Sequence, residues 1–328
     1  METGSGIMWF FKHRGFDDKS IHDMFNKCRR LEVVDREIAS ETWDYLRSTG
    51  IPGGKLSMVI RKCPKILTLD LHDKLVPMIQ CLATLESRPK EVASAIAKFP
   101  HILLQNLEEK LCPLLAFFEV LGAPEKQIGK LILLNPIIVS YSIESKLSRL
   151  VDFLAGLGLS KDGMVGRFVA KHPFIMRYSV EKRLRPACEF LRSLGLTEPQ
   201  LQRAAMNFPE VLCRDVNRVL RSNVTYLESC GFSSSQLAAV VAGYPLVIIN
   251  SISKLLRPRI KFLKEAMGRS VDEIAEYPGF FRHDIRRLKS RQKLLTQNGV
   301  ECSLSEMLDC KHKSKYHHHL GTISELLM

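Results

Sequence analysis

The sequence lacks any long run of apolar residues. No run approaches the roughly 20 residues that a helix needs to cross a bilayer, although 45% of the chain is apolar. That apolar fraction is ordinary for a folded protein. We therefore expect no membrane-spanning helix and no membrane partner.

Paired cysteines are also missing. The chain has nine cysteines but no C-x-x-C pair, the spacing typical of zinc sites and thiol–disulfide enzymes. Cys302, Cys310, His312 and His317–His319 fit no standard ligand spacing, and the lysines between them would repel a metal ion. We expect free, buried thiols in a reducing compartment, and neither a metal nor a cofactor.

The motifs of common active sites are absent as well. The chain has no G-x-S-x-G, no glycine-rich phosphate loop and no paired-carboxylate arrangement. His172 directly precedes Pro173, at a repeated position that other units fill with residues such as Phe208 and Tyr244. It is therefore interpreted as a turn or core residue, not as a catalytic base. Nothing in the sequence predicts an enzyme.

What the sequence does contain is a repeat. An X-Pro pair followed by apolar residues recurs seven times, at intervals of 36, 36, 37, 36, 36 and 33 residues. An apolar residue follows each proline by two places, a leucine follows the first six by eleven places, and a glycine ends the next segment. Such a period indicates a repeat architecture. The repeat prolines are Pro64, Pro100, Pro136, Pro173, Pro209, Pro245 and Pro278.

Each repeat is predicted to form two helices. The first helix ends at the X-Pro pair, because proline disfavours helical geometry in the residue before it. A short turn follows, and a second helix then runs to a Leu-Gly terminus. Prolines thirteen places after the repeat proline should bend this second helix; they are Pro77, Pro113, Pro186 and Pro258. Capping boxes at the start of the first helix are expected at Thr197–Gln200, Ser233–Gln236 and Ser270–Glu273.

Neither helix can bury its apolar face alone, so neighbouring repeats must stack. We predict an all-α fold, an α-solenoid of about seven to eight repeats over residues 20–310. An N-terminal extension (1–19) precedes it and a basic C-terminal tail (311–328) follows it. Residues 20–50 are interpreted as a diverged capping unit, with Cys28 in the place of the repeat proline and Trp43 in the core.

The charge is unevenly distributed. The net charge is +13 and the pI is about 9.4, which favours a polyanionic partner. Residues 64–150 are nearly balanced, whereas basic residues outnumber acidic ones about two to one between 161 and 293. Nine and twelve places after the repeat proline, three of the later repeats carry pairs of cations three residues apart, on one helix face. In the shorter last repeat Ser290 fills position twelve, and Arg291 next to it is paired with Arg287. The earlier repeats have Asp73 and Glu109 at position nine.

These cations are predicted to form a nucleic-acid-binding surface, here called the basic row. The alternative is a solvated helix face, but stacking like charges across four repeats costs stability unless an anion neutralises them. Arg259, in the basic run around Pro258, is included. The predicted residues are Lys182, Arg185, Arg218, Arg221, Lys254, Arg257, Arg259, Arg287 and Arg291.

The repeat resembles that of the mTERF family, the mitochondrial transcription termination factors and their plant relatives. The residues that carry the resemblance include Phe99-Pro100-His101-Ile102-Leu103, followed by Lys110-Leu111 and Leu121-Gly122. The resemblance extends over residues 50–310, and the short chain is similar to land-plant members. It implies a half-doughnut superhelix with a 3₁₀ turn at each X-Pro, and nucleic-acid binding in plastids or mitochondria.

The leading hypothesis is sequence-selective binding of double-stranded DNA by a monomer, for transcription termination or regulation of organelle gene expression. RNA binding for transcript maturation or splicing is the first alternative, and a protein-interaction scaffold is the second. The start of the chain is unlike an Arg- and Ser-rich transit peptide, because Glu2, Asp17 and Asp18 are acidic. The organelle, plastid or mitochondrion, therefore stays open.

Overall fold

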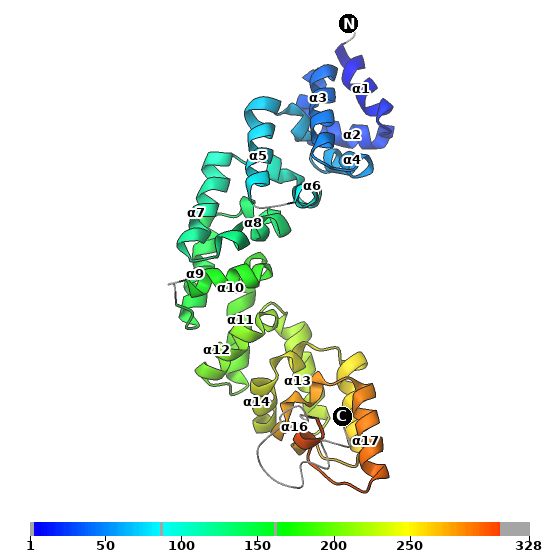
Figure 1. The fold of residues 1–328 in the computed structure, drawn as a ribbon, viewed down its shortest axis with the longest axis vertical. Helices are drawn as coiled ribbons and strands as arrows, with labels where there is room; N and C mark the ends of the chain where they lie inside the picture. The colour runs from blue at the N-terminus through cyan, green and yellow to red at the C-terminus, as the bar shows by residue number, and fades with distance from the viewer. Residues whose placement is uncertain (1–2, 86–87, 161–162, 309–328) are drawn as a thin grey trace. The chain divides into compact units, whose positions relative to one another are not determined.

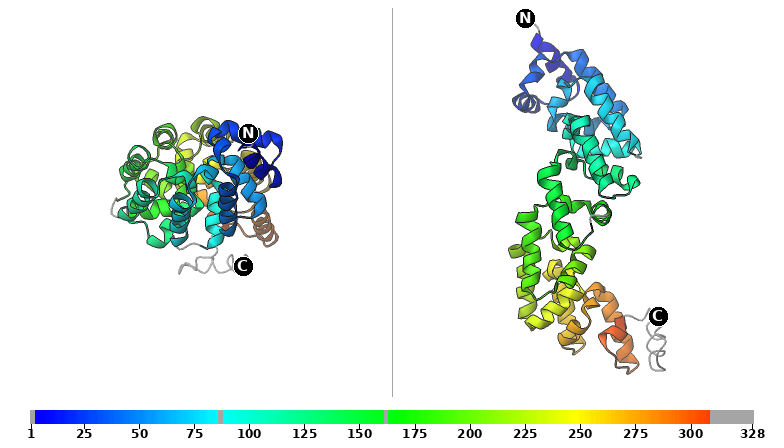
Figure 2. Two further views of the ribbon diagram at one scale, coloured as in Figure 1. Left: turned by 90° about the horizontal axis from the view of Figure 1, so that it is seen from above. Right: turned by 90° about the vertical axis from the view of Figure 1, so that its left-hand side faces the viewer.

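The computed structural model describes residues 3–85, 88–160 and 163–308, which form helices and turns without a strand in these ranges. The all-α prediction is thus confirmed. Two compact units are present, one ending at Arg177 and the other beginning at Tyr178, and in each the helices follow one another in chain order (Figures 1 and 2). Among the described helices, none is long and apolar enough to span a bilayer.

The first six X-Pro repeats each contain a first α-helix, a 3₁₀ turn, a π-helical turn and a second α-helix, and the last repeat lacks the π-helical turn. In the first unit these are α4 (Gly53–Lys62), η2 (Pro64–Thr68), η3 (Leu71–Leu75) and α5 (Val76–Thr84); α6 (Pro89–Lys98), η4 (Pro100–Leu104), η5 (Leu107–Leu111) and α7 (Cys112–Val120); α8 (Glu125–Leu134), η6 (Pro136–Ser140), η7 (Ile143–Leu147) and α9 (Ser148–Gly156); and α10 (Met164–Lys171) with η8 (Pro173–Arg177).

The second unit continues the same order. It contains η9 (Val180–Leu184) and α11 (Arg185–Ser193); α12 (Glu198–Asn207), η10 (Pro209–Val211), η11 (Val216–Arg221) and α13 (Ser222–Ser229); α14 (Ser234–Gly243), η12 (Pro245–Ile249), η13 (Ile252–Leu256), α15 (Arg257–Lys261) and η14 (Phe262–Ala266); and α16 (Asp272–Glu276), η15 (Pro278–Arg282), α17 (Ile285–Gln297) and α18 (Leu304–Leu308).

The X-Pro pair ends the first helix, as expected. In the repeat at Pro245, α14 stops at Gly243, and Tyr244 takes a non-helical conformation with φ −146°. Pro245 then opens the 3₁₀ turn, since its missing N–H is not needed in the first turn of a helix. Val247 and Ile248 on this turn are fully buried. The turn therefore anchors each repeat in the core.

The second helix begins with a wide turn that the sequence did not predict. Leu184 N–H donates to the carbonyl of Ser179, and Leu256 N–H to that of Ser251, both five residues back at 3.2 Å. This is the bonding of a π-helix. The prolines expected to bend the helix follow this turn. It also occurs in Ile143–Leu147 and Val216–Arg221, whose repeats lack that proline, so the proline is not its cause.

The helix ends follow the predicted signals with one exception. The glycines that close the second helices have positive φ, for example 94° at Gly195, which a residue without a Cβ adopts at no cost. In the capping box at Ser233, Gln236 Oε1 accepts from Ser233 N–H at 2.8 Å, and Gln236 N–H donates to Ser233 Oγ at 3.3 Å. At Thr197, Gln200 Oε1 accepts the Thr197 N–H at 2.9 Å.

The capping box predicted at Ser270 is wrong. α16 begins at Asp272, and the Ser270 hydroxyl donates to the Asp272 carboxylate at 2.7 Å. Glu273 accepts instead from Arg269 Nη1 at 2.6 Å. An arginine four residues before Glu273 thus competes for the carboxylate that would have closed the box.

The N-terminal segment is a diverged repeat with an added helix. It comprises α1 (Thr3–His13), α2 (Asp18–Lys27), η1 (Arg29–Val33) and α3 (Arg36–Ser48), and Cys28 separates α2 from the 3₁₀ turn. Trp43 is buried, with the rings of Phe10 and Phe16 against it at 6.0 and 6.1 Å. Trp43 thus lies in the core, as predicted, and α1 contributes Phe10 to the same core.

The described cysteines are all free thiols. Cys63, Cys188 and Cys213 are buried, and burial raises the pKa of the Cys63 thiol to about 11 and those of Cys188 and Cys213 to about 12. Because the thiolate is the reactive form, these three are inert core residues. Cys112 is exposed, so the expectation of buried thiols does not hold for every cysteine.

Candidate nucleic-acid interface

The basic row begins in the first turn of the second helices. Lys182, Arg218 and Lys254 each occupy the third helical position, three residues after the cap. Their backbone N–H groups donate to the cap side chains of Ser179, Asp215 and Ser251 at 3.2, 2.9 and 3.3 Å. The caps therefore fix the same backbone geometry in three successive repeats.

Packing of one leucine turns these side chains outward. Leu184, Leu220 and Leu256, two residues beyond the position-nine cations, are fully buried. The residues two places before and one place after the leucine consequently face solvent, and all six cations at positions nine and twelve of these repeats are exposed. They are Lys182, Arg185, Arg218, Arg221, Lys254 and Arg257.

Local helix electrostatics do not favour these cations. The N-terminus of a helix carries partial positive charge and is stabilised by acidic side chains. Asp73 and Glu109 occupy the third helical position in η3 and η5, in accordance with that rule. Lys182, Arg218 and Lys254 violate it at the equivalent position. Repeated violation points to a role outside the fold, in contact with an anion.

Cation–π contacts connect two arginines of the row to the repeats that precede them. The Arg221 guanidinium lies over the ring of Phe190 in the preceding repeat, 5.4 Å from its centroid. Arg257 lies over Tyr226 in the same way at 5.9 Å. Each arginine thus packs against the second helix of the preceding repeat. These stacks hold the guanidinium groups in a line and limit their rotation.

Ion pairing within the row is slight. Arg185 Nε donates to Glu181 Oε2 at 3.0 Å, and Arg221 Nε to the neutral Asn217 Oδ1 at 3.4 Å. In the described part of the chain, Lys182, Arg218 and Lys254 form no ion pair with an acid. Most of the row therefore keeps its positive charge available to a ligand.

The last repeat corrects the predicted row. Arg287 is exposed, but Arg291 is 8% exposed and its Nη1 donates to the carbonyls of Met307 and Leu308. α17 has no π turn, because Leu288 N–H bonds the carbonyl of Asp284 four residues back. The buried leucine thus comes one residue earlier, and Arg291 falls on the buried face with it.

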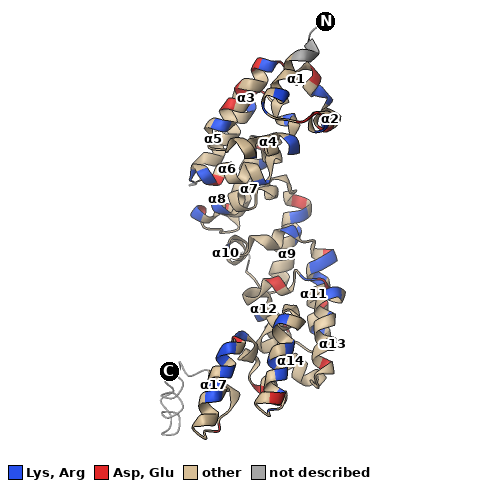
Figure 3. Cartoon of the chain, turned by 90° about the vertical axis from the view of Figure 1, so that its right-hand side faces the viewer, with Lys and Arg blue, Asp and Glu red and all other residues tan. Residues whose placement is uncertain are grey.

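Counting from the buried leucine, the equivalents of the paired cations are Arg286 and Lys289, both exposed. The sequence analysis missed these two residues because it counted positions from the proline. Counting from the buried leucine of the second helix identifies them. Figure 3 marks, in blue on the ribbon, positions of Lys and Arg along α17 and at α11.

Arg259 is likewise placed inside the protein. It is 9% exposed, and its Nε donates to the carbonyl of His283 at 2.8 Å while Nη1 donates to that of Leu255 at 3.2 Å. Burial lowers its pKa. The prediction that Arg259 belongs to the exposed surface is wrong: it ties α15 to the turn before α17.

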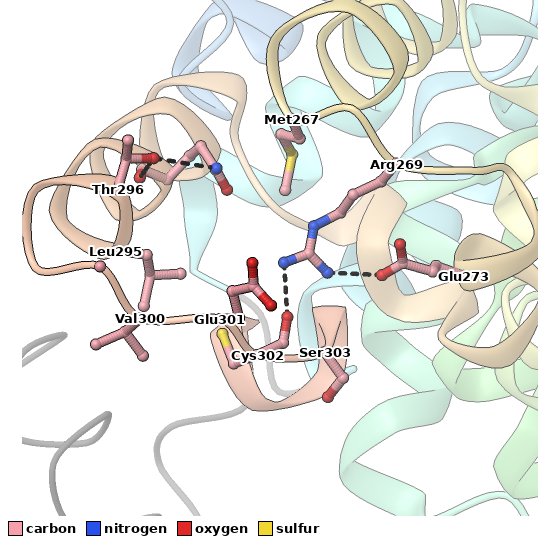
Figure 4. A pocket seen from close by; sticks show the side chains of 11 residues that line it. Met267, Arg269, Glu273, Leu295, Thr296, Val300, Glu301, Cys302 and Ser303 are labelled. Atoms are coloured by element: carbon pink, nitrogen blue, oxygen red, sulfur yellow. Dashed lines mark hydrogen bonds and ion pairs between the residues drawn. The ribbon is translucent and has the colours of Figure 1, made fainter.

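A separate pocket of about 750 Å³ lies near the end of the described chain. Figure 4 shows Arg269 pointing into it between Glu273 and Cys302. The Arg269 guanidinium donates to Glu273 Oε2 and to the Cys302 carbonyl, both at 2.6 Å. Its charge is thus used to connect α16 with the segment before α18, apart from the basic row.

The histidine-rich stretch considered as a zinc site falls mostly outside the described residues, since Cys310, His312 and His317–His319 lie beyond 308. Within the residues that are described, no group of three potential metal ligands occurs.

Comparison with known proteins gives two similarities. The family model described as mTERF matches residues 8–316. The chain is also 54% identical over 91 residues to the Arabidopsis thaliana protein named transcription termination factor MTERF6, chloroplastic/mitochondrial. That alignment spans 27% of this chain and 27% of the relative.

Proposed function

The chain belongs to the mTERF family, and we propose that it binds nucleic acid in an organelle through the basic row, regulating transcription there. The observation that carries this proposal is the series of exposed cations at helix N-termini, where local electrostatics disfavours them. The name of the Arabidopsis relative, a chloroplastic/mitochondrial transcription termination factor, supports both the compartment and the process.

The preferred ligand is double-stranded DNA. Arg221 and Arg257 each lie over an aromatic ring of the preceding repeat's second helix, so the pairs of cations form a series that can contact successive phosphates of one duplex. Contacts of this kind position a protein on the duplex, whereas base contacts set the sequence. The row lies within one chain, which supports binding as a monomer.

A competition experiment separates DNA from RNA. The full chain is saturated with a fluorescent duplex of organellar DNA, and unlabelled duplex or single-stranded RNA of matched length is added at fixed salt. We expect the duplex to displace the probe at a concentration at least tenfold lower than RNA. Preferential displacement by RNA would show that the basic row binds transcripts. If neither the duplex nor the RNA binds, the proposed function is overturned.

A further inference from the structure

A second charged surface lies on the first helices of the unit that ends at Arg177. Residues six and two places before the repeat proline are four apart and share one helix face. In α4, α6, α8 and α10 all of them are exposed, and each of these helices contacts the next. The pairs are Met58/Lys62, Ser94/Lys98, Lys130/Leu134 and Arg167/Lys171.

This surface reverses the charge pattern of the basic row. At the same positions the later repeats keep one cation, Arg203, and then have uncharged and finally acidic residues: Arg203/Asn207, Ala239/Gly243 and Asp272/Glu276. Conversely, Asp73 and Glu109 occupy the positions of the basic row in the first unit. The cations on α4 to α10 are therefore no general requirement of the repeat, and every first helix from α4 to α10 carries at least one of them.

A groove of about 230 Å³ lies between α6 and α8 on this surface. Lys90, Lys98 and Lys130 line it, together with Glu91, Ser94, Leu133 and Leu134. Three ammonium groups against one carboxylate leave the groove positive. In the described residues none of these lysines forms an ion pair, so their charge is not needed to balance the fold.

Exposed apolar side chains accompany the lysines. Leu134 is 52% exposed beside the groove, and Met58 on α4 and Met164 on α10 are 49% and 40% exposed. Among the described residues of the second unit, by contrast, Leu294 is the one exposed large apolar residue. Exposed apolar groups contribute nothing to phosphate binding, whereas Leu134, which lines the groove, can contact an apolar side chain of a protein partner. The two units thus offer different chemistry to a partner.

We propose that the groove between α6 and α8 docks an acidic amphipathic helix of a partner protein. The apolar stripe of that helix covers Leu134 and the groove, and its carboxylates meet Lys98 and Lys130. Helix-in-groove recognition requires this combination of apolar anchors and flanking complementary charge. The partner is thereby brought to a nucleic-acid-binding protein without occupying the basic row.

The test uses the full chain and a designed fluorescent peptide. The peptide has about 18 residues, or five helical turns, with leucines on one helical stripe and glutamates elsewhere; a scrambled peptide of the same composition is the control. We expect the amphipathic peptide to bind at least tenfold more tightly than the scrambled one. Lys98→Glu with Lys130→Glu should abolish this preference, and Leu134→Ser should reduce it without changing the charge.

Nucleic-acid affinity is measured on the same variants, with circular dichroism to confirm folding. The groove variants should bind nucleic acid with an affinity within about twofold of the wild type. Changing Arg185, Arg221 and Arg257 to Glu should leave peptide binding intact. Equal binding of the two peptides, or a Leu134→Ser variant that binds like the wild type, overturns the proposal. Loss of nucleic-acid binding in the groove double variant would assign this surface to nucleic acid instead.

Discussion

The Asp215 carboxylate joins two successive repeats. Its Oδ2 accepts from Arg183 Nη1 at 2.7 Å, while its Oδ1 caps the backbone N–H of Arg218 at 2.9 Å. One side chain therefore positions a member of the basic row and links that row to the repeat before it. These bonds, from Arg218 first and then from Arg183, hold the pKa of Asp215 below its usual range.

The contribution of the Asp215 carboxylate to stability should depend on pH. Because the pKa is lower in the folded state, the contribution of this carboxylate is fully present above about pH 4, the unfolded value, and is lost as the pH falls through the folded pKa. Asp215→Asn keeps a cap but loses the charge, so its melting temperature should be lower than wild type at pH 7 and converge with it at acid pH.

Thermal unfolding followed by circular dichroism checks this prediction. Asp215→Ala, which removes both the cap and the ion pair, should melt lower than Asp215→Asn at neutral pH. Identical melting of the wild type and Asp215→Asn at pH 7 would show that the link to Arg183 contributes nothing.

Close helix contact at Gly166 predicts a sharp steric effect. A Cβ there would overlap the Leu121 carbonyl, to which the Gly166 N–H donates at 3.1 Å. Gly166→Ala should therefore lower the free energy of unfolding by about 1–3 kcal/mol, as overpacking usually does. Gly156→Ala, at the end of α9 with open space around it, should be neutral or stabilise by up to about 1 kcal/mol. Urea titration of both variants measures the difference, and equal effects would contradict the contact.

In the last repeat, Lys289 is expected to bind nucleic acid, whereas Arg291 is expected to stabilise the fold. Lys289→Ala should reduce the slope of log affinity against log salt by about one and leave stability unchanged. Arg291→Met should instead cost about 1–3 kcal/mol of stability, because it leaves the buried carbonyls of Met307 and Leu308 unpaired. Parallel salt titrations and urea unfolding measure both. If Arg291→Met lowered the salt slope and Lys289→Ala lowered the stability, Arg291 would belong to the basic row after all.

Glu181 should act as an internal competitor for nucleic acid. Its two carboxylate oxygens accept from Arg185 Nε and Nη2 at 3.0 and 3.3 Å. Exposed ion pairs contribute little to stability, so Glu181→Gln should melt like the wild type. The freed Arg185 should raise affinity for duplex DNA about two- to fivefold. Glu228→Gln, an exposed acid on α13, is the matched control and should change affinity less.

The sequence predicted what the backbone dictates locally. X-Pro breaks and positive-φ glycines appear at fixed places, because few residues satisfy those conformations. The π turns had no such signature, since they occur before Pro186 and Ser222 alike. They arise when a buried leucine bonds five residues back, which depends on tertiary packing.

The contrast between local backbone signals and tertiary packing also explains which residues of the basic row were predicted wrongly. The position-nine and position-twelve cations of three repeats are exposed as expected, because each lies in or directly after a π turn that keeps the spacing from the proline. α17 lacks that turn, so the count from Pro278 gave Ser290 at position twelve, and the neighbouring Arg291 was chosen in place of Lys289. Arg259 shows a further limit: a buried arginine that satisfies backbone carbonyls has the same sequence appearance as one that binds phosphate.

The most direct measurement is the salt-dependent affinity for duplex DNA of the wild type and of the variant with Arg185, Arg221 and Arg257 changed to Glu. Six phosphate contacts predict a slope near −5 for the wild type, and the variant should lose nearly all binding while keeping its helical circular dichroism. A control with Arg30, Arg203 and Arg214 changed to Glu, all exposed and outside the row, has the same net charge and should bind within severalfold of the wild type. Wild-type affinity in the first variant, or an equal loss in the control, would contradict the basic row as the nucleic-acid interface.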